Sequence, residues 1–431
     1  MVRSVSAQHG KASEKIDPKS AINNLARWRR GVAQSIGHDP GAVLDEPSKS
    51  LLMMRVFANT RRLADLCLSH PGVAASTLMD GPSSVLAQAA RDLASLDRGV
   101  GGPDALHAAL APLKERADIA ISLAELGGDW SIAHATAARV DFVERLIESA
   151  LQWLVRSAVR RGELTVPDAE NIMAGVFVVA GGDFAHEDLP TYGPLDLIIA
   201  YDSEILKQQT VRGAERVFVR IGAEFRDVFE GNTGEHNLFG LRTPLGSGVG
   251  GAGFAESTTQ ILGTAGGPQT DELKIWLATA RIVAGDRVAG GSFLERVEEL
   301  VWAPAPKQMV QSAIHGEDDD PRQVYRDIAQ HCRLAVGATR PMFRTASAVE
   351  VIETAAKSGA MSADTMRRIC AGDELAHVLV SRLQTIKGSA SVVIENDGER
   401  AALATLCGYN SSEDLFAVVK GAGVDLSLIH I

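Results

Sequence analysis

The feature that most constrains the fold is a change in hydrophobic period near Gly175. Upstream of it, apolar residues recur at intervals of three and four, the spacing of amphipathic helices, and the longest stripe runs from Val140 to Val155. Residues 176–180 and 195–201 are two short continuous apolar runs, which predict buried strands. From residue 271 the helical period returns and holds nearly to the end. This order predicts a mostly helical α+β protein, with a small mixed sheet flanked by helical bundles.

The pattern divides the 431 residues into four parts. Residues 1–50 are expected to be a loosely ordered lead-in with one short helical piece around residues 21–36, and residues 51–170 an N-terminal helical region. Residues 171–270 are expected to form the α/β domain, and residues 271–431 a C-terminal helical bundle. The last residues, SLIHI, leave the amphipathic pattern, which is consistent with a longer natural protein.

Composition and charge argue against several classes of function. A net charge of −11 and a pI near 5.5 oppose binding to nucleic-acid backbones and to anionic lipid. The four cysteines form no CxxC pair, which argues against a disulfide framework or a zinc site. No apolar run approaches the roughly 18 residues that span a bilayer, and the first residues lack the apolar core of a secretory signal. We therefore expect a cytoplasmic protein with neither nucleic acid nor membrane as partner.

One acidic residue, Asp196, begins the second predicted strand, LDLIIAY. Residues two apart on a strand point to the same face, so an Asp-x-Asp pair there can hold magnesium beside a nucleotide triphosphate. Here the upstream position of such a pair is Pro194, and only Asp196 remains. A single acidic residue at a strand start is more commonly a turn or edge residue, so both interpretations stay open at this point.

Residues 176–202 resemble a known family. Their sequence, VFVVAGGDFAHEDLPTYGPLDLIIAYD, aligns without a gap with the strand, glycine-rich loop and Asp-x-Asp strand of the N-terminal half of glutamine synthetase adenylyltransferase, the adenylyl-removing enzyme. The residues on family positions are Gly182, Leu189, Asp196, Leu197, Tyr201 and Asp202. Further segments similar to family motifs include LAELGGDW at 123–130, TARIVAGD at 279–286, RLQ at 382–384 and LATLCGY at 403–409. The resemblance covers about residues 51–426.

The resemblance implies a nucleotidyltransferase-like domain that binds magnesium (Mg2+) and ATP or ADP at the strand of Asp196. Asp196 is then the candidate catalytic and metal-binding residue, and Gly182 and Arg281 are candidate cofactor-binding residues. An ordinary salt bridge on a helix is an equally open interpretation of Arg281. The family attaches AMP to a tyrosine of glutamine synthetase with its C-terminal half and removes it by phosphorolysis with its N-terminal half. The implied partners are glutamine synthetase and the PII signalling protein.

Departures from the family pattern cluster at the expected chemistry. Asp183 stands in place of the family's loop lysine, Ala185-His186 in place of its Gly-Gly turn, and Pro194 in place of its first metal-binding aspartate. No Asp or Glu occurs between residues 236 and 255, where a third carboxylate is expected. One carboxylate holds magnesium weakly, and a negative Asp183 would repel phosphates. We therefore predict that the domain keeps the fold and has little or no nucleotidyl transfer.

Two functions stay open on this evidence. The first is a catalytically impaired adenylyl-removing half, and the alternative is a non-catalytic regulatory or scaffold module that binds glutamine synthetase or PII. A decayed sequence without function is a third option. Saturable, magnesium-dependent nucleotide binding would favour the enzyme.

Several other features have ordinary structural explanations. The glycine-rich stretch 246–253 lacks the Gly-Lys-Ser/Thr ending of a phosphate loop and is expected to be a flexible loop. His134, His331 and His377 fall in helical patterns, and we expect packed or solvent-facing side chains rather than metal ligands. The acidic run 317–320 is expected to be a solvated turn, with a regulatory contact as the alternative.

Overall fold

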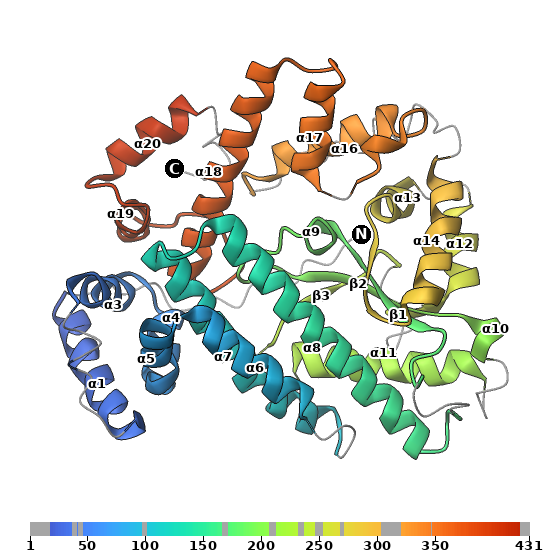
Figure 1. Ribbon diagram of the computed structural model, residues 1–431, viewed down its shortest axis with the longest axis horizontal. Coiled ribbons are helices and arrows are strands. Elements are labelled where there is room, and N and C mark those ends of the chain that lie inside the picture. Colours follow the sequence, from blue (N-terminus) through green and yellow to red (C-terminus); the bar gives the residue numbers. More distant parts are fainter. Residues whose placement is uncertain are drawn as a thin grey trace.

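Helices surround one small sheet in the computed structural model of the protein (Figure 1). The structure describes residues 18–36, 41, 46–96, 101–165, 171–206, 213–231, 237–245, 253–267, 271–302, 320–345 and 347–422. The expected α+β, mostly helical fold class is confirmed. No helix in these ranges is both long enough and apolar enough to cross a bilayer.

The N-terminal part is helical, as the period predicted. Its helices are α1 Pro18–Ile36, α3 Pro47–Asn59, α4 Arg62–Ser69, α5 Pro71–Asp80, α6 Pro82–Ala94, α7 Pro103–Gly127 and α8 Ile132–Arg160. A proline opens α3, α5, α6 and α7, where its fixed φ suits the first turn and its missing N–H costs nothing. At the other end of α7, Gly128 takes a left-handed φ of 79° and stops the helix.

Helix α1 lies where a short helical piece was expected, but in the part of residues 1–50 that the structure describes it is packed rather than loose. Trp28 is fully buried, and it lies in one apolar cluster with Met53 and Phe57 of α3. The rings of Trp28 and Phe57 lie 6.5 Å apart. A buried Trp side chain contributes a large apolar area to the stability of the core, so α1 is part of the N-terminal core.

Five strands form the sheet, in the order β3-β2-β1-β5, with β4 also paired to β2. The strands are β1 Val176–Gly181, β2 Leu195–Tyr201, β3 Leu241–Arg242, β4 Ala255–Ser257 and β5 Arg281–Gly285. Strand β1 runs antiparallel to β2 and to β5, whereas β3 and β4 run parallel to β2. The expectation of helix throughout the region after residue 271 is therefore wrong at β5, because pairing with the distant β1 decides its structure.

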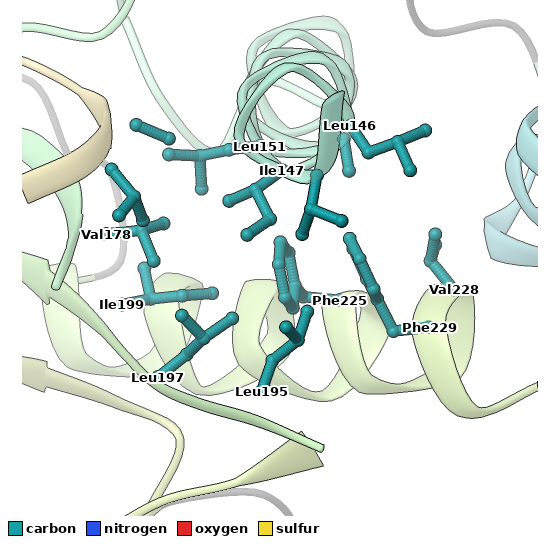
Figure 2. Packing of buried hydrophobic residues seen from close by; sticks show 14 of the residues in the cluster. Leu146, Ile147, Leu151, Val178, Leu195, Leu197, Ile199, Phe225, Val228 and Phe229 are labelled. Carbon is teal, nitrogen blue, oxygen red and sulfur yellow. The ribbon is translucent and has the colours of Figure 1, made fainter. Parts of the chain in front are cut away.

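Both faces of the sheet are covered by helices, which explains why its two main strands read as continuous apolar runs. On one face, α8 and α11 (Ala214–Glu230) pack over the strands, and Figure 2 shows Ile147 of α8 above Phe225 of α11, with Leu197 of β2 in the same apolar cluster. On the other face lie α12 Thr258–Ala265, α13 Asp271–Leu277 and α14 Arg287–Trp302. Two short helices, α9 Gly182–Ala185 and α10 Ser203–Leu206, follow β1 and β2.

The C-terminal part is a second helical group. It contains α16 Gln323–Val336, the 3-10 turn η2 Pro341–Phe343, α17 Ala348–Lys357, α18 Ala363–Lys387, α19 Asp397–Leu406 and α20 Ser412–Gly421. Four of these helices begin at residues whose side-chain oxygens accept an N–H of the first turn, namely Ser347, Ser362, Asn396 and Ser411. The long helix α18 connects this group to the rest of the molecule, because it contacts α4 and α8 as well as α17 and α19.

Candidate functional site

The end of β1 and the start of β2 bring two of the predicted site residues together. Gly181, the last residue of β1, pairs with Asp196 on the antiparallel β2, and Gly182 follows directly. Gly182 has a positive φ of 54°, and a Cβ there would lie 2.6 Å from the Oδ2 of Asp196. Only glycine accommodates both the backbone conformation and this close approach. Gly182 thus keeps the backbone in contact with the Asp196 carboxylate.

Arg242 occupies both oxygens of Asp196. Its Nε donates to Oδ1 at 3.0 Å and its Nη2 donates to Oδ2 at 2.8 Å. The parallel register of β2 and β3 places the two residues opposite each other. The carboxylate is 15% exposed and the arginine 59% exposed, so this is a bidentate pair at the rim of the sheet. The guanidinium of Arg242 therefore already pairs with the carboxylate that the sequence predicted to be a metal ligand.

Trp276 of α13 covers the neighbouring backbone. A Cβ on Gly181 would lie 1.9 Å from the Cε2 of Trp276, so the indole lies directly on this glycine. Side chains of directly opposed residues in an antiparallel pair point to the same face, so the indole covers the face that Asp196 shares. The Nε1 of Trp276 is buried and hydrogen-bonds to nothing in the described part of the chain. The region beside Asp196 is thus occupied by protein side chains.

Asp183, the substitute for the family lysine, is not left with an uncompensated charge. Its carboxylate lies 2.9 Å from the Nη1 of Arg326 and 3.4 Å from the Nη2 of Arg322. Burial raises the pKa of Asp183, and the two guanidinium groups act against that rise. The expectation that Asp183 would present bare negative charge to a phosphate is therefore corrected, because two buried arginines pair with it.

Arg281 lies on β5 and donates hydrogen bonds to the backbone of α9, the turn that follows Gly182. Its Nη2 donates to the carbonyl oxygen of Phe184 at 3.0 Å, and its Nε donates to that of Ala185 at 3.3 Å. It also pairs with Glu144 of α8, and its guanidinium lies 5.3 Å from the ring centre of Phe184. The salt-bridge interpretation fits these contacts, although the residue is on a strand rather than on a helix. Arg281 holds α9 against α8 in this structure.

The other residues and segments that the sequence singled out provide no further metal ligands in the described part of the chain. Among the described residues, no group of three or more His, Cys, Asp or Glu side chains is arranged to hold a metal ion. His186, in the place of a family glycine, is buried, and this burial together with Arg333 and Arg326 lowers its pKa to about 3. Most of the glycine-rich stretch 246–253 lies outside the described residues. Of the acidic run 317–320 only Asp320 is described, and it is no solvated turn residue, because it pairs with Arg322 at 2.5 Å.

Sequence reasoning missed Arg242, Trp276, Arg322 and Arg326. Each reaches the site from another element, so the local pattern around Asp196 holds no sign of them. A weak signal existed for Arg242, because it lies in the stretch where the resemblance led us to expect a third carboxylate.

Comparisons with known proteins support the resemblance. Residues 51–246 match the family described as glutamate-ammonia ligase adenylyltransferase. A protein of Rhodopseudomonas palustris is 25% identical over 305 residues, which is 69% of this chain and 30% of that protein. A protein of Caulobacter vibrioides is 26% identical over 430 residues, 91% of this chain and 42% of that protein. Both are named bifunctional glutamine synthetase adenylyltransferase/adenylyl-removing enzyme.

The chain aligns with less than half the length of these relatives, at 30% of one and 42% of the other. The family match at residues 51–246 includes helices α4 to α8, Gly182 directly after β1, and β2 with Asp196. The chain is thus similar to the glutamine synthetase adenylyltransferase family over part of its length, the resemblance that its motifs predicted.

Proposed function

We propose that this chain is an adenylyl-removing-type module that retains the family fold and has lost nucleotidyl transfer. The observation that carries the proposal is the bidentate pair between Asp196 and Arg242. The relatives' names support a role in the control of glutamine synthetase, and the composition of the sequence favours the cytoplasm. Such a role would be exerted by binding rather than by chemistry.

The electrostatics of the pair oppose a metal ion. Magnesium prefers several hard oxygen ligands, and here it would find one carboxylate with both oxygens already accepting hydrogen bonds. To bind, it would have to displace the guanidinium, and the freed positive charge of Arg242 would then stay close to the ion on the adjacent strand. Without the metal, the triphosphate of ATP or the diphosphate of ADP loses its main source of charge neutralisation.

Trp276 adds a steric argument. The indole lies against Gly181 and over the face that Asp196 shares, so a nucleotide at this edge would have to displace it. Displacement would expose apolar surface that now packs in the cluster of α12 to α14. Both observations favour a non-catalytic regulatory module that binds glutamine synthetase or the PII protein over an impaired enzyme.

The test is AMP release from adenylylated glutamine synthetase in the presence of phosphate and magnesium. We expect no release above background from the wild-type chain, and no saturable magnesium-dependent binding of ATP or ADP by calorimetry. Arg242→Ala, which frees Asp196, is compared with Arg216→Ala on the exposed side of α11 as the matched control. Brisk turnover by the wild type that Asp196→Ala abolishes would refute the loss of catalysis.

A binding measurement separates the regulatory module from a chain without function. The wild-type chain is passed over immobilised glutamine synthetase and, separately, over immobilised PII protein. Saturable binding to either, unchanged by Asp196→Ala, supports the module. Absence of binding to both, together with absence of turnover, contradicts it.

A further inference from the structure

A cluster of charges around the buried Arg322 and Arg326 joins three parts of the fold that are distant in sequence. Its carboxylates come from the β1–β2 connection, from residue 320 and from α18, and its cations come from residues 322–326 and from α18. Its members are Asp183, Asp188, Asp320, Asp373, Arg322, Arg326 and His377. Sequence reasoning expected His377 to be an ordinary packed or solvent-facing side chain, and the candidate function makes no use of it.

Asp188 is the centre of the cluster. Its Oδ1 lies 3.1 Å from the Nη1 of Arg322, and its Oδ2 lies 2.9 Å from the Nη2 of Arg326. The Nε2 of His377 lies 2.6 Å from the same Oδ1. Burial opposes the ionisation of Asp188, but Arg322, Arg326 and His377 outweigh it and hold its pKa well below the usual value. Asp188 is therefore a carboxylate over the whole neutral range.

Both ring nitrogens of His377 face acceptors. Nε2 faces the carboxylate of Asp188 at 2.6 Å, and Nδ1 faces the backbone carbonyl oxygen of Asp373 at 2.8 Å. A neutral imidazole has one N–H and one lone pair, so it can donate to only one of these two oxygens. The other nitrogen would then direct its lone pair at an oxygen lone pair. Only the doubly protonated imidazolium satisfies both contacts.

The charges around the ring favour the same state. The β1–β2 connection presents Asp188, the helix of His377 presents the Asp373 carboxylate at 3.5 Å from Nδ1, and residue 322 presents a guanidinium behind Asp188. From α8, Arg139 lines a cavity of about 10 Å³ beside the ring, and its charge is offset by Glu125 at 3.8 Å. In the whole cluster four carboxylates face two guanidinium groups, so a positive His377 reduces the excess negative charge.

We propose that His377 is a partly buried imidazolium that clasps α18 to the β1–β2 connection, and that this clasp weakens when the ring loses its proton. The contact lies five residues along the chain from Asp183, so it links the C-terminal helices to the turn at the candidate site. A second contact between the β1–β2 connection and α18, from the Tyr192 N–H to the Oε1 of Gln384 at 3.1 Å, carries no charge. It would remain when His377 loses its proton. The inference does not depend on the proposed function.

The direction of the pH effect follows from linkage. Burial lowers the pKa of His377, but Asp188 and Asp373 outweigh it and raise the pKa above the ordinary value. A raised folded-state pKa means that the stabilisation is complete below the unfolded value of about 6.5 and is lost as pH rises through the folded value. Between the two values, the unfolding equilibrium constant grows by up to about tenfold per pH unit.

The experiment is a histidine titration of the full chain labelled with ¹⁵N-histidine, followed by long-range ¹H–¹⁵N spectra from pH 5 to pH 9. His377→Gln identifies the signal, and His331→Gln, an exposed histidine on α16, is the matched control. We expect both nitrogens of His377 to show imidazolium shifts at pH 6.5 and to titrate above it. A ring that is neutral at pH 6.5 would overturn the proposal.

Hydrogen exchange tests the clasp itself. After correction for intrinsic rates, exchange in residues 186–192 and in α18 should accelerate as pH rises through the titration of His377. His377→Lys, which keeps a cation, should delay this acceleration to higher pH if the clasp is electrostatic, and His331→Gln should leave it unchanged. Exchange that stays constant across the titration in the wild type would refute the clasp even if the ring is charged.

Discussion

The contact between Gly181 and Trp276 gives a sharp test of how the candidate site is filled. In Gly181→Ala, the new Cβ would lie 1.9 Å from Cε2, 2.1 Å from Nε1 and 2.4 Å from Cζ2 of the indole. The backbone itself tolerates alanine, since Gly181 has φ −130° and ψ −171°, an ordinary extended conformation. The whole penalty therefore comes from the ring, which must leave its place over the Asp196 face.

The magnitude follows from two opposing terms. Overpacking of this kind costs about 1–3 kcal/mol, and the lower chain entropy of the unfolded alanine variant returns about 0.4–1 kcal/mol. We expect the free energy of unfolding of Gly181→Ala to fall by about 1–2 kcal/mol, as measured by urea denaturation. Gly291→Ala on α14 is the control, because a Cβ there meets nothing within 4 Å. That helix-interior change should be stabilising by about 0.5–1 kcal/mol.

A double-mutant cycle with Trp276→Ala attributes the cost to the indole. Once the ring is removed, the alanine at position 181 has room. The loss of unfolding free energy in the double variant should therefore be smaller than the sum of the losses in the two single variants. Coupling of about 0.5–3 kcal/mol is typical of residues in contact. If the two single effects add to within about 0.5 kcal/mol, Trp276 does not lie on Gly181 and the steric argument against nucleotide binding fails.

Two further predictions concern buried groups away from the site. Glu125→Ala removes a carboxylate that is 3% exposed and pairs with Arg382 and Arg139, so unfolding free energy should drop by about 3–5 kcal/mol. Asp141→Ala, which breaks an exposed pair on α8, should cost under about 1 kcal/mol, and equal losses would contradict the burial argument. Burial raises the pKa of the Cys67 thiol to about 12, so a disulfide reagent at pH 8 should label it only when the chain unfolds. Rapid labelling under native conditions, scored by mass spectrometry, would count against this.

Local pattern was sufficient for the elements whose burial is continuous. The runs at 176–180 and 195–201 correspond to β1 and β2. Helices cover both faces of these strands, so their side chains are apolar on both sides and the sequence is a continuous apolar run. Strand β5 could not be found in the same way. Its five residues are too few to distinguish a strand from a buried turn of helix, and its partner β1 is about 100 residues upstream.

The site was predictable only in the part that is local. The resemblance named Gly182 and Asp196, and the structure places them side by side because β2 runs antiparallel to β1 and so begins beside its end. Arg242 depends on the register of a two-residue strand, and Trp276 depends on how α13 packs across the sheet. Neither register nor helix docking is encoded in the residues around Asp196, so those contacts required the structure.

Asp183 shows why a charge cannot be interpreted from one position. Taken alone, a carboxylate in place of a lysine predicts repulsion of phosphate, yet the buried Arg322 and Arg326 pair with Asp183. The potential at a buried site is a sum over all neighbours, and these neighbours come from a segment about 140 residues downstream. The case for lost catalysis therefore rests on Asp196, whose two oxygens are already engaged, rather than on the charge of Asp183. The same pairing gives the substitution a structural role, since it ties the site turn to the C-terminal helices through the cluster that contains His377.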